Sequence, residues 1–573
     1  MNAMRAIACL LMLAAYSHAD AGVAASLGCA ESLRDLGPSE LVSYGTPKIE
    51  RREARRPESG SRMGPLAVSP VNPRYFSDPS GRIVYLTGAH TWNNLVDMDS
   101  QFPPHPFNFD AYLDFLKAHN HNLIRLWAWE VTGPNDERDT PQRKIAAPQP
   151  WRRTGPGLDL TGLPKFDLTK FDPSYFQRLR TRVEAARDRG LYVIVMLFEG
   201  WSVQFSPGKL SHPFYGTNNI NGTDYLKDVR DIHALRYPQI TQLQKRYVHA
   251  VLDTVNDLDN VLFEIANEAG SYSTDWQHTM LRFVKCYELT KPSQHPVGMT
   301  YQYLGGTNSA LFDSEADWIA PGGESGNYLL RPEMATGLKI IISDSDHLAG
   351  SSLGDPMWVY KNFFQGLNTL YMDRYAGPDA LNKEQDRFAP EIRAAMGQVR
   401  LIASLFNMGA MVPVPGLATT GYALQGTEGI LVLAPDEARF NIDLTRMPGQ
   451  IRLEWFDTLT GQVSDGGTIN GGSTVLFQAP SRRGEVLYLR AALSTGPLLA
   501  EIQDRAQSIR QASMHYAPWM IRVRAVARPY LDKISDGYRA LVLSLFMCVG
   551  GGMALGFGGG WILASRASKQ PLS

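Results

Sequence analysis

Residues 260–270 read NVLFEIANEAG, an apolar run that holds one carboxylate, Glu264, and ends abruptly in Asn267-Glu268. Strands that are buried on both faces of a parallel sheet have such near-continuous apolar sequences. Polar groups at the end of such a strand are costly to bury unless they have partners. The stretch therefore predicts a buried strand whose carboxyl end carries functional side chains.

Seven further runs share this character, and helical patterns lie between most of them. In chain order, the eight runs occupy residues 82–92, 121–130, 190–201, 260–270, 295–304, 316–323, 338–347 and 367–377. Eight strand–helix units within about 300 residues favour an α/β fold, a closed (β/α)8 barrel of the TIM type. An open doubly wound sheet is the alternative, but no G-x-G-x-x-G loop follows the first strand.

The sequence changes character on either side of the barrel, which we place at residues 65–408. Residues 409–492 hold short strand-like runs separated by frequent turns, which is typical of a small all-β sandwich. Residues 20–64 include a charged stretch rich in Pro, Gly and Ser, so we expect a flexible segment there. Residues 493–539 have a helical pattern of mixed charge, and we expect them to form a juxtamembrane helical segment.

The two ends of the chain indicate export and membrane attachment. Residues 1–19 combine a basic residue, a short apolar run and a small-residue cleavage pattern, which predicts a signal peptide. Residues 540–565 carry no charge and are long enough to cross a bilayer, and Arg566 and Lys569 follow them. We therefore expect a single-pass cell-envelope protein with its catalytic domain on the periplasmic or extracellular side. An uncleaved membrane helix and a buried soluble helix are the respective alternatives.

The chain has four cysteines, Cys9, Cys29, Cys286 and Cys548. Cys9 lies in the signal segment and Cys548 in the C-terminal apolar segment, so a disulfide framework is excluded. A lipid anchor at Cys29 is an alternative role for that thiol.

Composition narrows the classes of function further. The 573 residues carry 56 Lys and Arg against 57 Asp and Glu, a formal net charge of -1. Nucleic-acid-binding domains usually show a basic excess, so we expect no nucleic-acid partner. The patterns H-E-x-x-H and C-x-x-C are absent. We therefore expect no metal and no organic cofactor.

Polar and aromatic side chains gather where the apolar runs end, which is where (β/α)8 barrels place their functional groups. These candidate site residues are His90, Trp92, Arg125, Trp127, Trp129, Glu199, Trp201, Asn267, Glu268, Tyr301, Tyr303, Asp344, Asp346 and His347. The aromatic members could line sugar subsites, although ordinary packing explains each Trp or Tyr as well.

The fourth run resembles the fourth-strand signature of the large clan of retaining glycoside hydrolases with (β/α)8 barrels, which includes cellulases, mannanases and galactosidases. The resemblance rests on Asn267-Glu268 at the tip of that run. It implies that Glu268 is the general acid/base and that Asn267 contacts a sugar hydroxyl. Strand alternation predicts Glu264 and Glu268 on one face and Asn267 on the other. A charge at a helix N-terminus is the structural alternative for Glu268.

The clan has a nucleophilic Glu at the end of its seventh strand, and here the seventh run ends in Ser-Asp-Ser-Asp-His. Asp344 falls roughly where that Glu would lie, with Asp346 as the second candidate and Glu324 as the third. His347 could tune either aspartate. Arg125 matches an Arg that the clan has near its nucleophile, and a partner role for buried Glu264 is the alternative.

A wider resemblance covers about residues 65 to 492. The stretches VSPVNPRYFSDPSGRIVYLTGAHTWNNL, IISDSDH and GQIRLEWFDTLTGQV look similar to secreted bacterial barrel proteins of the apiosidase-type group, whose C-terminal sandwich is often labelled collagen-binding. This resemblance implies a glycoside hydrolase with a carbohydrate substrate, and the two chain ends add the expectation that it is exported and membrane-anchored. The alternatives are a non-catalytic carbohydrate- or matrix-binding envelope protein on a hydrolase-like barrel, and an adhesin whose sandwich binds a partner.

Overall fold

The computed structural model describes residues 28–33, 65–133, 145–205, 207–324, 328, 330–349, 355–373, 375, 388–436, 438–481, 484–493 and 498–515. The predicted signal peptide (1–19), most of the segment 20–64 and the predicted membrane span (540–565) lie outside these residues. Among the helices that are described, none has the length and apolar character needed to cross a membrane.

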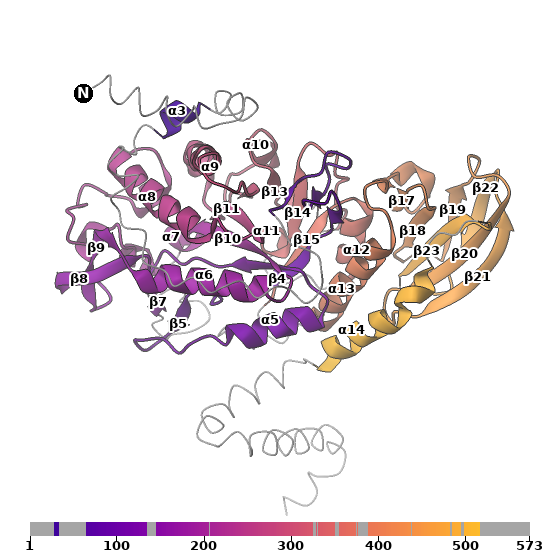
Figure 1. The fold of residues 1–573 in the computed structure, drawn as a ribbon, viewed down its shortest axis with the longest axis horizontal. Coiled ribbons are helices and arrows are strands. Elements are labelled where there is room, and N and C mark those ends of the chain that lie inside the picture. Colours follow the sequence, from indigo (N-terminus) through magenta and orange to yellow (C-terminus); the bar gives the residue numbers. More distant parts are fainter. Residues whose placement is uncertain are drawn as a thin grey trace, which may run out of the picture. The chain divides into compact units, whose positions relative to one another are not determined.

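Eight parallel strands close into a barrel in the order β10-β11-β12-β13-β14-β15-β4-β6 (Figure 1). In chain order the barrel strands are β4 (Thr87–His90), β6 (Leu123–Leu126), β10 (Tyr192–Glu199), β11 (Val261–Asn267), β12 (Val297–Thr300), β13 (Trp318–Ala320), β14 (Ile340–Asp344) and β15 (Asn368–Met372). Each predicted run supplies one strand, so the predicted barrel is confirmed. The doubly wound alternative is wrong, because β15 pairs with β4 and closes the sheet.

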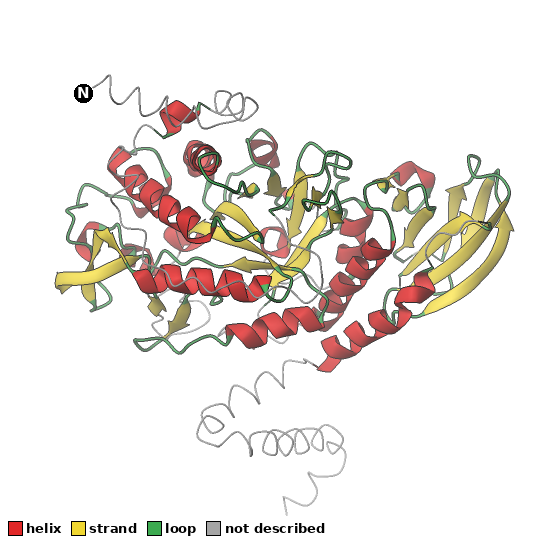
Figure 2. Cartoon of the chain, viewed as in Figure 1, coloured by secondary structure: helices red, strands yellow, loops and turns green. Residues whose placement is uncertain are grey.

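Helices cover the outside of the strands (Figure 2). The longer ones in this region are α5 (Phe109–Ala118), α6 (Pro173–Arg187), α8 (Pro238–Val255), α9 (Thr274–Glu288), α12 (Met357–Phe364) and α13 (Ala389–Leu405). Local sequence fixes where they begin. Asp172 accepts a hydrogen bond from the backbone N–H of Ser174, and Pro173 occupies the first turn of α6.

The barrel interior is apolar at its amino end. Leu86, Leu123, Leu262 and Ile340 meet there with Phe76 from the small sheet β1 (Ala67–Val68), β2 (Phe76–Ser77) and β3 (Ile83–Val84). All these side chains are almost fully buried. This core packs the amino ends of the strands together, and the polar groups lie at their carboxyl ends.

Two antiparallel pairs elaborate the loops after the first two barrel strands. β5 (Asp97–Asp99) pairs with β7 (Ile145–Ala147), and β8 (Trp151–Leu158) pairs with β9 (Pro164–Phe171). Since both pairs follow the carboxyl ends of β4 and β6, they stand at the end of the barrel where the polar groups gather.

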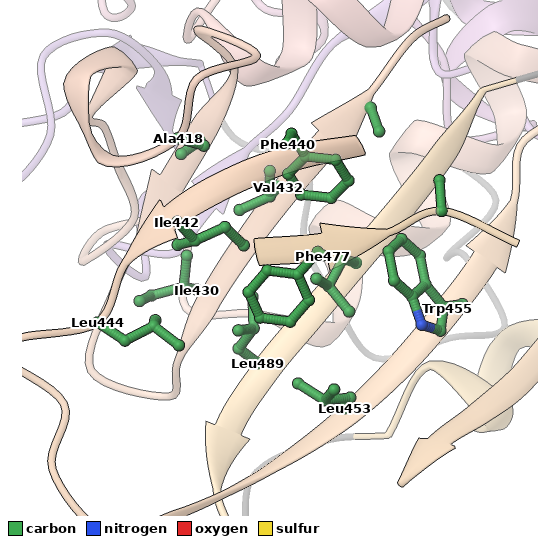
Figure 3. Packing of buried hydrophobic residues seen from close by; sticks show 14 of the residues in the cluster. Ala418, Ile430, Val432, Phe440, Ile442, Leu444, Leu453, Trp455, Phe477 and Leu489 are labelled. Atoms are coloured by element: carbon green, nitrogen blue, oxygen red, sulfur yellow. The ribbon is translucent and has the colours of Figure 1, made fainter. Parts of the chain in front are cut away.

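The C-terminal unit is all-β and consists of two sheets around one apolar core (Figure 3). The larger sheet has the order β16-β17-β18-β23-β20-β21 and the smaller one is β19-β22. Their bounds are β16 (Val412–Pro413), β17 (Ala423–Gln425), β18 (Ile430–Ala434), β19 (Arg439–Asp443), β20 (Gln450–Asp457), β21 (Val463–Asn470), β22 (Thr474–Gln478) and β23 (Glu485–Ala491). Phe440 and Phe477 of the small sheet stack at 5.9 Å over this core. The arrangement fits the predicted sandwich.

Of the predicted segment 493–539, residues 493 and 498–515 are described, and the latter contain the helix α14 (Gln503–His515). The sandwich holds this region in place: Val463 N–H donates to Gln503 Oε1 at 2.8 Å, and Leu499 N–H donates to Glu454 Oε2 at 2.9 Å. This part of the segment therefore packs on the β-unit.

A disulfide bond joins Cys29 of α3 (Cys29–Ser32) to Cys286 of α9. The sequence predicted no disulfide, because the cysteine count excluded a framework and 257 residues separate these two thiols. The alternative of a lipid anchor at Cys29 is wrong in this structure, since the thiol is already bonded.

Candidate active site

The carboxyl ends of the barrel strands bring six of the predicted site residues into one buried network with Glu264: His90, Arg125, Asn267, Asp344, Asp346 and His347. Arg125 is its centre and is fully buried. It donates from Nε to Glu264 Oε2 at 2.7 Å and from Nη2 to Glu264 Oε1, which makes a bidentate pair. It also donates to Asp344 Oδ2 at 2.9 Å and to Asn267 Oδ1 at 2.6 Å. The sequence offered Glu264 and the candidate nucleophile Asp344 as alternative partners of Arg125, and in the structure Arg125 binds both.

Asp344 lies deep in this network and is only 1% exposed. Its Oδ1 lies 3.2 Å from His90 Nε2 and accepts from the backbone N–H of Asp346 at 3.0 Å, while Oδ2 accepts from Arg125. Burial alone would raise the pKa of Asp344, but His90 and Arg125 hold it well below its ordinary value. Asp344 is therefore a fixed negative charge with both oxygens occupied.

Asp346 differs from Asp344, although only one residue separates them. It stands in the first turn of α11 (Ser345–Ala349), is 9% exposed, and its Oδ2 has no hydrogen-bond partner among the described residues. The nearest cation is Arg125, whose Nη1 is 3.9 Å away. Burial and the charge of Asp344 raise the pKa of Asp346 to about 6.

Glu268 follows β11 directly and has a left-handed backbone, with φ of 50°. Within the described residues no hydrogen bond reaches its carboxylate, and its side chain is as exposed as that of Asp346. Burial raises the pKa of Glu268 well above its ordinary value, and the charges of Asp346 and Glu199 raise it further. Because the charge of Asp346 is among the causes that raise the pKa of Glu268, Asp346 releases its proton before Glu268 does.

Residues that follow the neighbouring strand β10 hold the backbone of Glu268 in place. Gln204, in α7 (Trp201–Phe205), donates to the carbonyl oxygen of Glu268 at 2.7 Å. Gly200 packs so tightly on Ala269 that a Cβ at that position would lie 2.3 Å from the Ala269 Cα. Only glycine fits this close approach of the two strand ends.

Asn267 does not follow the predicted alternation. Its Oδ1 accepts from Arg125, as Glu264 does, and lies 2.9 Å from His347 Nε2. The prediction is wrong because the side chain of Asn267, at the end of β11, reaches the same guanidinium as the side chain of Glu264. Burial lowers the pKa of His347 to about 3, so this histidine is neutral.

Glu199 lies at the end of β10 and is completely buried. Its carboxyl group accepts from the backbone N–H of Ser202 at 3.0 Å and contacts the Ser202 hydroxyl. Burial raises the pKa of Glu199 to about 8. Its own N–H donates to Glu130, so Glu199 belongs to the support of the site.

Glu130, His212 and His233 form a second buried group behind Glu199. His212 Nε2 lies 3.1 Å from Glu130 Oε1, and His233 Nε2 lies 2.9 Å from Glu130 Oε2. These contacts overcome burial and lower the pKa of Glu130 to about 2. Sequence reasoning missed both histidines, because they come from an irregular stretch between α7 and α8 with no periodic signal. Glu130 did stand at a predicted strand end.

The predicted aromatic residues separate into two groups. Trp127 and Trp129 are buried: Trp127 stacks on His90 at 5.3 Å and lies 5.8 Å from Trp129, whose Nε1 donates to the carbonyl of Trp92. Trp92 itself is half-buried. The second group stands at the rim.

Phe205 connects the rim residues, contacting Trp201 at 5.8 Å and Tyr303 at 5.4 Å. Tyr303 is 41% exposed and is available to a ligand. Tyr301 instead donates its hydroxyl to the Gly306 carbonyl. Glu324, the third predicted nucleophile, accepts from the backbone N–H of Asn308 and so supports a neighbouring loop.

Several buried polar atoms of this network have no partner among the described residues, as occurs at catalytic sites and where a water or an ion is bound. They are His90 Nδ1, Trp127 Nε1, Asn267 Nδ2, Asp346 Oδ2 and His347 Nδ1. His90, Asp344 and Asp346 also offer ligand atoms within 4.8 Å of one another, as in a metal site. Arg125 already supplies positive charge to both aspartates, so we assign no metal there.

Comparisons with known proteins agree on the fold. A family described as a domain of unknown function (DUF6298) matches residues 146–300. A glycoside hydrolase family 5 protein from Bacteroides vulgatus has a TM-score of 0.53 at 14% identity, over 79% of this chain and 100% of that chain. A second glycoside hydrolase has a TM-score of 0.50 at 14% identity, over 77% of this chain and 99% of that chain. No curated protein matches the chain.

At this identity the likeness shows the fold: the chain has the eight-stranded parallel TIM barrel found in those glycoside hydrolases. Retention of configuration and collagen binding by the sandwich stay predictions.

Proposed function

We propose that the protein is a glycoside hydrolase that cleaves O-glycosidic bonds of a poly- or oligosaccharide at the carboxyl end of its barrel. One observation carries the proposal: within the described residues the Glu268 carboxyl group and Asp346 Oδ2 accept no hydrogen bond, and the charge of Asp346 raises the pKa of Glu268. A protonated acid beside an ionised carboxylate is what glycoside hydrolysis requires.

In the proposed retaining reaction, Glu268 donates its proton to the glycosidic oxygen as the bond from that oxygen to the anomeric carbon breaks. Asp346 Oδ2 forms a bond to the same carbon, giving a glycosyl ester. Water then attacks the anomeric carbon, Glu268 takes the proton of that water, and Asp346 leaves as a carboxylate. No electron transfer and no further reactant are needed.

Asp344 takes a different role in this proposal. Both of its oxygens are occupied and it has almost no exposed surface, so it orients His90, Arg125 and the backbone of Asp346. Its fixed negative charge also disfavours a second negative charge on Asp346 and makes that carboxylate a better nucleophile. Asn267 Nδ2 and Trp127 Nε1 are buried donors without a hydrogen-bond partner among the described residues.

We further propose that this activity is exported and held at the cell envelope by the predicted signal peptide and by residues 540–565. The Cys29–Cys286 disulfide supports export, because such bonds persist in oxidising compartments.

The test is hydrolysis of a broad glycan panel by the full chain and by Glu268→Gln, with Glu31→Gln as an exposed control. We expect hydrolysis by the wild type and the control, and a loss of about 10²–10⁴ in rate for Glu268→Gln with sugar binding retained. NMR of the first product should show the starting anomeric configuration. Equal inertness of all three proteins, with binding intact, would favour the non-catalytic carbohydrate-binding alternative.

A further inference from the structure

A cavity of about 490 Å³ lies at the amino end of the barrel. Residues 81–85 in its wall lead into the start of β4, Asn122 directly precedes β6, and the lining residues between 400 and 409 include the end of α13. Because the barrel strands run in parallel, this end is opposite to the carboxyl end that carries Glu268. The size of the cavity is that of a small-molecule site.

Much of the lining is apolar. Tyr85, Phe406 and Met408 contribute to it and are at most 6% exposed, so they form a packed apolar wall. Val71 also lines the cavity and is 72% exposed, which is unusual for a valine. Apolar surface in a concave site favours a ligand with an apolar part, because that part leaves water on binding.

The charged residues of the lining are two arginines, Arg82 and Arg400, and no carboxylate among the described residues belongs to it. Arg400 Nη1 donates to the carbonyl oxygen of Asn120 at 2.9 Å and to its side-chain oxygen at 2.8 Å. Both acceptors are neutral, and Arg400 has no ion pair with the described residues. Arg82 is paired with Asp78 at 3.2 Å, although its own side chain is 68% exposed.

The surroundings of Arg400 add further positive charge. Arg505 of α14 is exposed and also has no ion pair within the described part of the chain. Burial and the charges of Arg505 and Arg82 lower the pKa of Arg400 to about 10. Asp78 balances one of these three guanidinium groups, so an excess of positive charge remains, and an anion among them lowers their mutual repulsion.

Arg400 is placed to bind such an anion. Its side chain is half-buried in the cavity wall, and its Nε and Nη2 atoms donate to none of the described residues. A guanidinium binds phosphate and carboxylate groups through two parallel N–H donors, and Nε and Nη2 form one such pair.

We propose that this cavity binds an amphiphilic anion, a molecule that joins an apolar body to a phosphate or carboxylate group. Arg400 pairs with the anionic group, and the apolar body packs on Phe406 and Met408. A membrane lipid and a free amphiphile share this chemistry. The site lies apart from the carboxylate network, so it stands or falls independently of the proposed hydrolysis.

Calorimetry of the full chain with three probes tests the site. Hexyl phosphate has an apolar chain and an anionic group, hexanol has the chain alone, and inorganic phosphate has the anion alone. We expect hexyl phosphate to bind at least about tenfold more tightly than either of the others, and Arg400→Gln to weaken its binding about tenfold. Arg439→Gln, at an exposed arginine of the sandwich, is the matched control and should leave Kd unchanged.

Val71→Glu tests the same site without removing the contacts of Arg400 to Asn120. Because Val71 is 72% exposed, the substitution leaves the core intact, and the new carboxylate should repel the anion and raise Kd for hexyl phosphate. Val71→Lys, of similar length but opposite charge, should not raise it. Equal Kd values for the three probes, or the same Kd in the wild type, Arg400→Gln and Val71→Glu, would overturn the proposal.

Vesicles distinguish the two sources of the anion. The titration with hexyl phosphate is repeated with vesicles of phosphatidylcholine alone and of phosphatidylcholine with phosphatidylglycerol. A higher apparent Kd with the anionic vesicles, seen in the wild type but not in Arg400→Gln, assigns the cavity to a lipid headgroup. The same Kd with both vesicles assigns it to a free amphiphile.

Discussion

Arg125 Nη1 lies 2.9 Å from Asp344 Oδ2 and thereby joins the second strand of the barrel to the seventh across its interior. The same guanidinium binds Glu264 on the fourth strand. A buried ion is costly without close partners. The three charged groups at the carboxyl end of the barrel therefore stabilise one another, and removing one leaves the others without a partner.

The first prediction concerns the shape of that cation. Arg125→Lys keeps the charge but cannot serve Glu264, Asn267 and Asp344 at once, because an ammonium lacks the planar fork of the guanidinium. We expect the free energy of unfolding to fall by about 3–5 kcal/mol, as when a buried ion pair loses a partner. Urea denaturation measures it. Arg452→Lys, at an exposed pair with Asp465, is the control and should change little; equal effects would contradict the central role of Arg125.

The second prediction separates the two aspartates. Asp344→Asn should cost about 3–5 kcal/mol of stability, because it removes a carboxylate that Arg125 and His90 bind. Asp346→Asn should be neutral or stabilising near pH 7, because the raised pKa of Asp346 shows that folding disfavours its charge. Hydrolysis should nevertheless fall steeply in both variants.

Azide then identifies the nucleophile. A small anion can occupy the space left in Asp346→Ala and attack the anomeric carbon, so azide should restore activity there and yield a glycosyl azide. Asp344→Ala should not respond. Rescue of Asp344→Ala alone would assign the nucleophile to Asp344 and sink the role proposed for Asp346.

The third prediction concerns the support beneath Glu268. Gly200→Ala would place a Cβ 2.6 Å from the backbone N of Ala269, so the ends of β10 and β11 must separate. We expect a loss of about 1–3 kcal/mol in stability and a lower kcat at similar KM, since Glu268 moves with Ala269. Gly416→Ala is the matched control, because its added Cβ meets no atom within 4 Å. Unchanged kcat in Gly200→Ala would show that this approach does not position Glu268.

These residues also show what the sequence could predict. The apolar runs indicated all eight strands, because parallel strands buried on both faces need near-continuous apolar sequence. Their polar ends indicated Arg125, Glu268 and Asp344 as neighbours, since all strands of a barrel end at one mouth. The position of Asn267 was not predictable from alternation, because its side chain binds Arg125 together with that of Glu264, and this shared contact depends on a residue of another strand.

The sequence also did not predict the contacts that join segments far apart in the chain, and the reason is related. The Cys29–Cys286 bond and the two histidines on Glu130 depend on where irregular segments settle against the barrel. The spacing of apolar residues within a segment indicates its secondary structure but not where an irregular segment packs on the barrel.

The fourth prediction uses the buried carboxyl group of Glu199. Burial raises its pKa to about 8 in the folded chain, while an unfolded Glu titrates near about 4.3. Between these values the folded state holds a proton that the unfolded state has released, so stability falls as pH rises through this window. Glu199→Gln keeps a neutral side chain of the same shape and should remove that slope.

Thermal unfolding of the wild type and of Glu199→Gln across the range from about pH 5 to about pH 8 measures this effect. The difference in Tm between variant and wild type should grow in favour of the variant toward high pH. Glu31→Gln, an exposed carboxylate, should instead follow the wild type throughout. Parallel curves for wild type and Glu199→Gln would mean that Glu199 is ionised in the folded protein, and its charge would then act on Glu268 at neutral pH as well.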